Sequence, residues 1–256
     1  SLQSPLDPVL TITDTRGVQL AFNHDGRINL DPFLVWKPPA DGDYIIRVAG
    51  FVYPPAADVR FYGNSSSIYH LSLVDGPWLN HVFPPSLPQG RETKLELHGW
   101  NLGDASRSVK PSAKEEEEGM HRLSLTGSPN HLEVPVIPLP HHLEKEPNEV
   151  RTNAVKLTVP FVFAGRIGRP DDKDHVAFEA KAKQRIEFKI LSASKGRPLD
   201  PVLEILLDDT GRSLRRTDDS GGPDPTYLWT ARKDGTHYVA VSELFGEGGT
   251  NAVYQL

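Results

Sequence analysis

The sequence predicts an all-β fold of tandem antiparallel β-sandwiches, and three observations support this prediction. Apolar and β-branched residues alternate with polar residues in short runs, which is the period of a half-buried strand. Gly, Pro, Asn and Asp bound these runs and are typical of turns. The chain has 23 prolines in 256 residues, which leaves little room for long helices. The expected strands include residues 9–13, 44–48, 94–98, 122–125, 185–190, 202–206 and 238–241.

The chain repeats part of its own sequence. Leu-Asp-Pro-Val-Leu at residues 6–10 returns at residues 199–203. Later positions agree at matching intervals: Gly17 with Gly211, Asp25 with Asp219, Asp31 with Asp224, Trp36 with Trp229, Asp41 with Asp234, Val48 with Val241 and Tyr69 with Tyr254. Chance alone rarely produces such agreement, so we interpret the repeat as a duplicated domain.

The second copy follows a segment, residues 144–197, that has no counterpart before the first copy. This segment holds about three strands, and burying each large apolar side chain contributes roughly 2 kcal/mol. Their loss, on the order of 15 kcal/mol, would exceed the stability of an ordinary domain. We therefore expect residues 1–75 to be the C-terminal part of a sandwich that an upstream segment of the same protein, or another chain, completes.

Residues 76–140 have a different character from the two copies. A proline-rich stretch at 83–90 leads into a strand-like run that ends in Gly99-Trp100-Asn101-Leu102, and this resembles the start of an immunoglobulin-like domain of the IPT/TIG kind. We expect an immunoglobulin-like domain over 76–140 and a complete sandwich over 141–256. The run 106–119, with glutamates at 115–118, is expected to be a solvated loop because adjacent carboxylates repel. Residues 134–140 are expected to form an edge strand that passes into a linker.

Composition excludes several classes of function. The net charge is −6 and no cluster of Lys and Arg is present, which argues against nucleic-acid binding. The absence of cysteine excludes disulfides and thiolate zinc sites. No apolar run reaches the roughly 20 residues that span a bilayer, so no membrane span is expected. The first residues do not resemble a signal peptide.

Two acidic segments suggest a cation site. Residues 144–149 read Glu-Lys-Glu-Pro-Asn-Glu, and residues 171–175 read Asp-Asp-Lys-Asp-His, directly ahead of an alternating strand. Calcium takes six to eight oxygen ligands in flexible geometry, and carboxylates at alternating positions can converge on one ion. Asp172 and Asp174 are two apart and would face the same side of a strand. Spacing alone leaves open a simple acidic linker followed by an Asp-rich turn.

Six separated motifs occur in an order that resembles the bacterial pre-peptidase C-terminal domain. They are 146–149, 164–167, 172–174, 199–201, 218–219 and 234–239. The resemblance covers residues 144–256 and, from the shared Leu-Asp-Pro, residues 6–73. It implies antiparallel β-sandwiches that are appended to secreted or surface proteins, often hydrolases, and are not themselves catalytic.

The collagen-binding domains of bacterial collagenases belong to the same structural group. In those domains a Glu-x-Glu-Pro-Asn segment and a following Asp-x-Asp turn hold calcium. The resemblance therefore implies six candidate calcium ligands here. They are Glu144, Glu146, Asn148, Asp172 and Asp174, with Asp171 as an extra one.

A second acidic set lies in the loops of the second copy: Asp208, Asp209, Asp218, Asp219 and Asp224. Asp25 and Asp31 recur in the first copy, and His24 stands where the second copy has Asp218. We favour turn capping for this set over a second metal site. Trp36 and Trp229 are expected to fill cores, with an exposed stacking platform as the alternative.

No recognisable catalytic motif is present, neither a Gly-x-Ser-x-Gly elbow, a His-Glu-x-x-His helix nor a phosphate loop. The resemblance implies a non-catalytic accessory, spacer or adhesion array in a larger extracytoplasmic bacterial protein, with calcium stiffening the junction near residues 144–148. A carbohydrate- or protein-binding module is the alternative, and a hydrolase fragment is a third reading. The expected partners are an extracellular protein or polysaccharide and the upstream domain.

Overall fold

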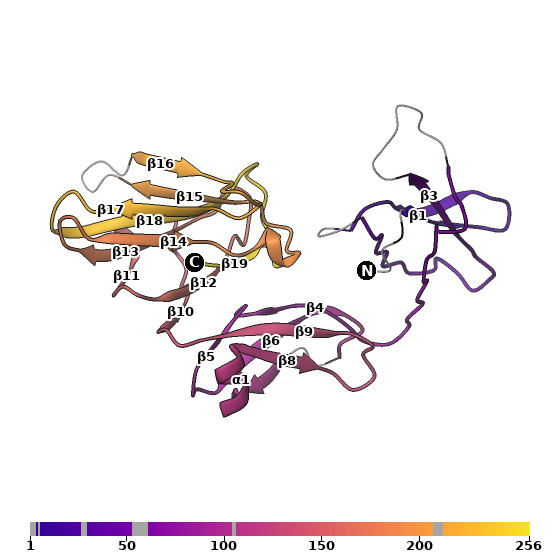
Figure 1. Cartoon of the computed structure of the whole chain (residues 1–256), viewed down its shortest axis with the longest axis horizontal. Coiled ribbons are helices and arrows are strands. Elements are labelled where there is room, and N and C mark those ends of the chain that lie inside the picture. The colour runs from indigo at the N-terminus through magenta and orange to yellow at the C-terminus, as the bar shows by residue number, and fades with distance from the viewer. Residues whose placement is uncertain (1–3, 5, 27–29, 53–60, 104–105, 207–211) are drawn as a thin grey trace. The chain divides into compact units, whose positions relative to one another are not determined.

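The computed structural model describes residues 4, 6–26, 30–52, 61–103, 106–206 and 212–256. The chain divides into two compact units, Ser1–Leu73 and Val74–Leu256. Within the described residues the fold is almost entirely strand and turn, as predicted (Figure 1). This part of the chain contains no helix with the length and hydropathy of a membrane span.

The unit Ser1–Leu73 contains one small antiparallel sheet. β1 (Leu6–Thr13) lies between β2 (Gln19–Asn23) and β3 (Ile45–Val52). A tight turn joins β1 to β2, in which the Asp14 carboxylate accepts hydrogen bonds from the backbone N–H groups of Arg16 and Val18. Gly17 takes the left-handed conformation, with a φ of 86°, that this turn requires.

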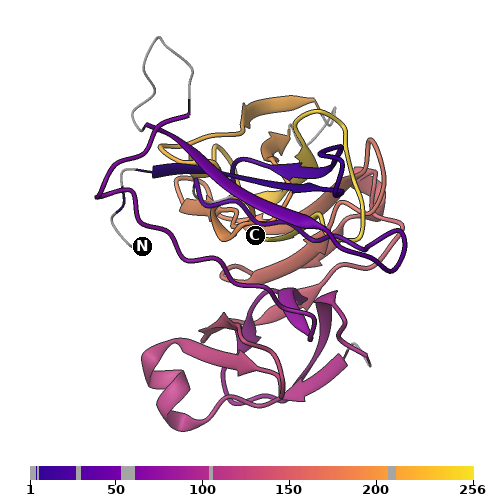
Figure 2. The ribbon, with the colours of Figure 1, turned by 90° about the vertical axis from the view of Figure 1, so that its right-hand side faces the viewer.

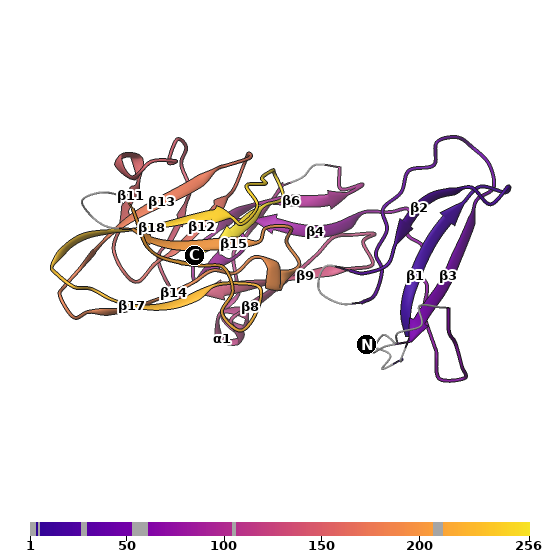
Figure 3. The ribbon, with the colours of Figure 1, turned by 90° about the horizontal axis from the view of Figure 1, so that it is seen from above.

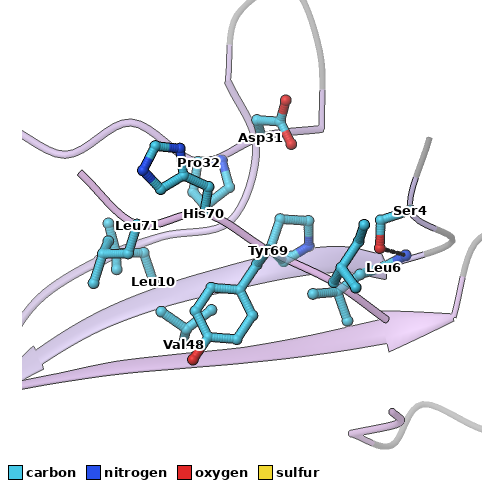
Figure 4. Close-up of a pocket in the computed structure, with 11 residues that line it drawn as sticks. Ser4, Leu6, Leu10, Asp31, Pro32, Val48, Tyr69, His70 and Leu71 are labelled. Atoms are coloured by element: carbon cyan, nitrogen blue, oxygen red, sulfur yellow. Dashed lines mark hydrogen bonds between the residues drawn. The ribbon is translucent and has the colours of Figure 1, made fainter. Parts of the chain in front are cut away.

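The core of this unit is thin. Val9 and Ile12 are its buried large hydrophobic side chains among the described residues. Tyr69, His70 and Leu71 lie over the sheet face that carries Leu10, leaving a shallow pocket between them (Figure 4). Large apolar side chains that stay exposed are Val18, Leu20, Phe22, Leu30, Phe33, Val35, Ile45, Phe61, Tyr62, Ile68, Tyr69, Leu71 and Leu73.

Aligned residues of the two repeated segments differ in their burial. Tyr69 is 60% exposed, whereas its counterpart Tyr254 is fully buried. Leu10 and Val48 are half-buried, whereas Leu203 and Val241 lie in the core of the second copy.

Residues 78–137 form a second, smaller sandwich. One sheet has the order β4 (Trp78–Phe83), β6 (Thr93–Trp100) and β7 (Ser106–Val109), and the other has β5 (Leu87–Pro88), β9 (His131–Ile137) and β8 (Met120–Ser124). The core between them consists of aliphatic side chains from both sheets. They are Leu79, Val82, Leu87, Leu95, Leu97, Val109, Leu123, Val134 and Val136.

The acidic run does not form the solvated loop that we predicted. Its first part is strand β7, and residues Ala113–Glu118 form helix α1, which lies beside β8 (Figure 2). Ser112 and Glu115 make a capping box, and Gly119 ends the helix in the left-handed conformation. The repulsion between the glutamates is relieved because Glu115 also pairs with His121 at 2.7 Å.

Strand β9 is also placed differently from our prediction of an edge strand. It lies between β8 and β5. The prolines are tolerated because Pro135 pairs only with Met120 of β8, at the point where the β8 ladder ends, and the pairing with β5 begins one residue later at Val136.

Residues 141–256 form a complete sandwich of two layers. The first is a five-stranded sheet with the order β11 (Val155–Leu157), β13 (Lys173–Ala180), β18 (Gly235–Glu243), β15 (Pro201–Leu206) and β16 (Ser213–Thr217). The second contains β10 (His141–Leu143), β12 (Val162–Arg166) and β19 (Val253–Gln255), with the ribbon of β14 (Arg185–Lys189) and β17 (Thr226–Thr230). A bridge from Leu191 to Gln255 connects β19 to the ribbon. Figure 3 shows the β14–β17 ribbon lying apart from the five-stranded sheet.

The sheets are mixed rather than purely antiparallel. Three short pairings are parallel: β10 with β12, β11 with β13, and β5 with β9. Each involves a strand of two or three residues. β5 and β11 follow a strand of the other layer, and β10 follows β9 of the smaller sandwich, so none of the three enters its sheet through a hairpin.

One continuous core fills the complete sandwich. Its largest fully buried side chains include Tyr254, Phe163 and Phe178. Trp229 is 7% exposed and packs edge-on against Phe178, with ring centroids 5.6 Å apart. The prediction that both tryptophans fill a core is therefore confirmed for Trp229, whereas Trp36 is only half-buried and meets Tyr44 edge-on, with ring centroids 4.8 Å apart.

The turn-capping role predicted for the second acidic set is confirmed at Asp224. Its carboxylate accepts hydrogen bonds from the backbone N–H groups of Ser192, Ala193 and Ser194, at the start of the 3₁₀ helix η2 (Ala193–Lys195). Asp208 and Asp209 lie outside the described residues.

Replacing Asp224 by alanine is expected to lower the free energy of unfolding by about 1–2 kcal/mol, because three backbone donors lose their acceptor. Urea unfolding of the full chain measures this loss. The exposed Asp219→Ala serves as the control and is expected to change stability by less than about 0.5 kcal/mol. Equal losses in the two variants would contradict the capping role.

Candidate metal centre

Glu144 stands directly after β10, on the segment that enters the complete sandwich. Its backbone N–H donates to the carbonyl oxygen of Ala164 at 2.9 Å, continuing the parallel pairing with β12. Its Oε2 accepts a hydrogen bond of 2.5 Å from the backbone N–H of Arg166. These two bonds fix the glutamate carboxylate at the end of β12.

Asp174 approaches the same point from the opposite layer. It is the second residue of β13 and lies on the core-facing side of the strand, in line with Val176 and Phe178. Its side chain has no exposed surface. Its Oδ2 accepts a hydrogen bond of 2.6 Å from the hydroxyl of Tyr254 in β19.

Gly165 makes this hydrogen bond between the layers geometrically feasible. Gly165 pairs with Tyr254 in the β12–β19 ladder. A Cβ at position 165 would lie 2.4 Å from the Tyr254 hydroxyl oxygen and 2.5 Å from its Cζ. The tyrosine ring can therefore lie across β12 and reach Asp174 only because residue 165 has no side chain.

Three carboxylates converge at this place. One oxygen from each of Glu144, Glu146 and Asp174 lies within 4.8 Å of the other two. Glu146 is exposed and Glu144 is half-buried. The cluster thus leads from the solvent to the edge of the hydrophobic core.

Asn148 and Asp174 hold buried polar atoms without hydrogen-bond partners. Asn148 is 2% exposed, and both atoms of its side-chain amide lack a partner, as does Oδ1 of Asp174. The Asn148 backbone is fixed, since its N–H donates to Glu146 and its carbonyl accepts from the N–H of His175. Because buried polar atoms nearly always have partners, these free oxygens indicate a ligand.

Burial and mutual repulsion strongly favour the protonated forms of the two inner carboxyls. Burial, and then the charge of Glu144, raise the pKa of Asp174 to about 8, although the hydrogen bond from the hydroxyl of Tyr254 opposes this. Burial, and then the charge of Glu146, raise the pKa of Glu144 to about 7. A cation between them would remove both causes of these raised pKa values.

The structure does not bring the other two predicted ligands into this cluster. Asp172 is buried beside Asp174, but its oxygens accept hydrogen bonds from the backbone N–H groups of Gly168 and Lys173. Asp171 is exposed, and its Oδ1 would lie 2.7 Å from a Cβ added to Gly246. These two aspartates shape the turn before β13.

Three comparisons with known proteins were made. No family model matches the chain, and no curated protein matches it. A solved structure, the pre-peptidase C-terminal domain of a collagenase from Bacillus anthracis, is similar to part of the chain. The identity is 17%, the TM-score is 0.33, and the match covers 44% of this chain and 96% of that domain.

The residues of the cluster fit calcium. Every donor is an oxygen from a carboxylate or an amide, which is the ligand type that calcium prefers over softer metals. Glu144, Glu146 and Asp174 would hold the ion, and Asn148 Oδ1 is a free oxygen beside them. Such an ion would neutralise the carboxylates and link the entering segment to β13.

The site also adjoins the smaller sandwich. The backbone N–H of Arg166 holds Glu144, and the guanidinium of the same residue reaches the smaller sandwich. There it pairs with Glu96 at 3.0 Å and lies 4.5 Å from the centroid of the Phe83 ring. Phe83 in turn packs with Ala164 and Val253. Arg166 therefore connects the carboxylate cluster of the larger sandwich to Glu96 and Phe83 of the smaller one.

Sequence reasoning missed Tyr254 and Gly165 as parts of the site. Gly165 belongs to one of the motifs that carried the family resemblance, and Tyr254 recurs in the repeat as Tyr69. Both signals were present in the sequence. Their connection depends on the pairing of β12 with β19, which no local pattern predicts.

Proposed function

We propose that the chain is a non-catalytic accessory segment of a larger secreted or surface protein, in which calcium stabilises the sandwich of residues 141–256. The observation that supports this most directly is the convergence of Glu144, Glu146 and Asp174 beside buried oxygens that have no partner.

The ion would act on the junction between the two sandwiches of the unit Val74–Leu256. Glu144 and Glu146 belong to the segment that leaves the smaller sandwich, whereas Asp174 belongs to the sheet of the larger one. A shared cation would attach that segment to the sheet and hold the Arg166 contacts with Glu96 in place. The proposed role is to fix two modules relative to each other.

The experiment is a calorimetric titration of calcium into the full chain after treatment with a chelator. We expect saturable binding of calcium by the wild type. Asp174→Asn is expected to weaken binding at least about 100-fold, because even removal of an outer partner of a ligand typically costs 10–100-fold. Asp171→Asn is the matched control in the same turn and is expected to bind as the wild type does.

Two results would count against the calcium site. One is the absence of saturable binding by the wild type at millimolar calcium. The other is equal affinity of the wild type and Asp174→Asn.

We further propose that residues 6–73 are the C-terminal part of a second sandwich of the same kind, and that residues 76–140 are an immunoglobulin-like spacer of the IPT/TIG type. The first proposal is supported by the incompletely covered sheet face around Leu10, Val48 and Tyr69, whose counterparts in the second copy lie in one core with residues of β12 and β14. The partner that fits this face is a set of strands equivalent to β12–β14, supplied by the same larger protein.

A further inference from the structure

A second group of metal-ligating side chains lies in the unit Ser1–Leu73, at one end of its sheet. Asp7 is the second residue of β1, and His24 and Asp25 directly follow β2. The antiparallel pairing of β1 with β2 ends with Leu10 opposite Asn23, so the start of β1 lies beside the residues that follow β2. One ligand atom from each of Asp7, His24 and Asp25 lies within 4.8 Å of the other two.

Two atoms of this group face each other without a hydrogen bond. His24 Nε2 lies 3.2 Å from Asp7 Oδ1, yet both atoms are buried and lack a hydrogen-bond partner. Asp7 as a whole is 8% exposed. The two atoms lie at ion-pair distance, but no hydrogen bond satisfies the buried carboxylate oxygen, although native structures normally satisfy such atoms.

The geometry suits a metal ion better than a proton. A proton shared between the two atoms would need a nearly linear N–H···O arrangement, and that hydrogen bond is not formed. Ligands of a tetrahedral zinc ion lie about 2.0–2.1 Å from the metal and therefore about 3.3 Å from each other. The observed 3.2 Å separation between Asp7 and His24 is close to this value.

The surroundings of the pair are consistent with a preformed site. The His24 ring meets the Phe51 ring edge-on, with centroids 5.4 Å apart. The Phe61 ring stacks on the Phe51 ring, with centroids 5.3 Å apart. These contacts fix the orientation of the imidazole. Asp25 Oδ2 lies 3.7 Å from His24 Nδ1, and the Asp25 side chain is 54% exposed, so it is free to turn toward an ion.

The repeat explains why the two copies would differ at this corner. Asp7 corresponds to Asp200 and Asp25 to Asp219, whereas His24 stands in place of Asp218. Imidazole nitrogen is a ligand that zinc and similar metals accept, whereas calcium selects oxygen. The substitution gives only the first unit a nitrogen donor at this corner.

We propose that Asp7, His24 and Asp25 bind a divalent transition-metal ion, for which Zn²⁺ is the best match, with the fourth position open to water. The site is separate from the carboxylate cluster around Asp174, and it does not depend on the function proposed for that cluster. It would join the start of β1 to the end of β2 in a unit whose apolar core is thin.

The test uses the full chain, freed of metal and then held in millimolar calcium so that any oxygen-only site is filled. Zn²⁺ is titrated by calorimetry, and Co²⁺ is added in parallel because its visible absorption reports coordination by the imidazole. The wild type is expected to bind Zn²⁺ saturably. His24→Gln is expected to weaken binding at least about tenfold.

Two further variants complete the design. Asp25→Asn changes an exposed side chain, so it is expected to fold and to weaken Zn²⁺ binding as well. His70→Gln removes another histidine of the same unit and is expected to leave the affinity unchanged. The proposal is overturned if the wild type shows no saturable binding, if His24→Gln and Asp25→Asn bind as the wild type does, or if His70→Gln weakens binding equally.

Discussion

Removing calcium from the full chain at pH 8 is expected to lower its free energy of unfolding by roughly 4 kcal/mol, if free calcium had been about a thousandfold above its dissociation constant. The expected loss falls as the pH is lowered. The reason is that the two inner carboxyls, Glu144 and Asp174, must be ionised to bind calcium, and burial and mutual repulsion raise their pKa values to about 7 and about 8.

The direction of the pH effect without metal follows from proton binding. The ordinary pKa values of these carboxyls, 4.5 and 3.8, apply in the unfolded chain. Between about pH 4 and pH 8 the folded, metal-free chain therefore binds more protons than the unfolded chain. Glu144 and Asp174 therefore contribute stability to the metal-free chain at the acid end of this window, and this contribution is lost as the pH rises through 7 and 8.

Urea unfolding at pH 5.5 and pH 8, each with chelator and with calcium, measures both effects. The difference in the free energy of unfolding between the sample with calcium and the sample with chelator is expected to be larger at pH 8 than at pH 5.5. Asp174→Asn should remove most of this pH dependence, and without metal it should be more stable than the wild type at pH 8, because the unpaired buried charge is gone. A calcium effect of equal size at both pH values, or a metal-free Asp174→Asn that is less stable at pH 8, would refute the coupling.

The second large effect is expected for Gly165→Ala, which should cost about 3 kcal/mol or more in the free energy of unfolding. An added Cβ would overlap the ring of Tyr254, which is fully buried. Forcing extra volume into a packed core costs about 1–3 kcal/mol. Displacing the ring would also break the hydrogen bond from Tyr254 to Asp174, and leaving a buried donor or acceptor without its partner costs about 1–3 kcal/mol.

Gly168→Ala is the matched control for this substitution. A Cβ added at position 168 would lie 3.7 Å from its nearest neighbour, Oδ2 of Asp172, which is an ordinary van der Waals contact. Chemical denaturation of the two variants in chelator isolates packing from metal binding. If Gly165→Ala unfolds at the same urea concentration as Gly168→Ala, the ring of Tyr254 does not lie over β12 as described.

The fold class was predictable because turn residues and alternation are local signals. Helix α1 could also have been predicted, since Ser112 and Glu115 have the spacing of a capping box. The four adjacent glutamates outweighed that signal in our interpretation. The structure shows that Glu115 and Glu116 accept hydrogen bonds from the backbone N–H groups of Ser112 and Gly90, whereas Glu117 and Glu118 are exposed to solvent.

The candidate site was predictable only in part. The alternating acidic residues located Glu144, Glu146 and Asp174 correctly as neighbours in space. Spacing could not separate Asp174 from Asp171, because the difference depends on the left-handed conformation of Asp171, whose φ is 59°. That conformation turns the chain just before β13, and Asp171 meets Gly246 instead of the cluster.

The group of Asp7, His24 and Asp25 could not be found from sequence at all. Its members come from the two ends of a hairpin, and only the register of β1 with β2 brings them together. The repeat did mark the positions, but the recurrence of Asp25 as Asp219 favoured a turn-capping role. The approach of His24 to the buried oxygen of Asp7 is visible only in the structure.

The central claim is that Glu144, Glu146 and Asp174 share one calcium ion. The most direct measurement is a crystal structure of the chain grown in calcium. We predict an ion at 2.3–2.6 Å from one oxygen of each of the three carboxylates, the range that calcium takes with oxygen ligands. Well-ordered density in which oxygens of Asp174 and Glu144 lie at hydrogen-bond distance with no ion between them, at pH 8 and millimolar calcium, would contradict it.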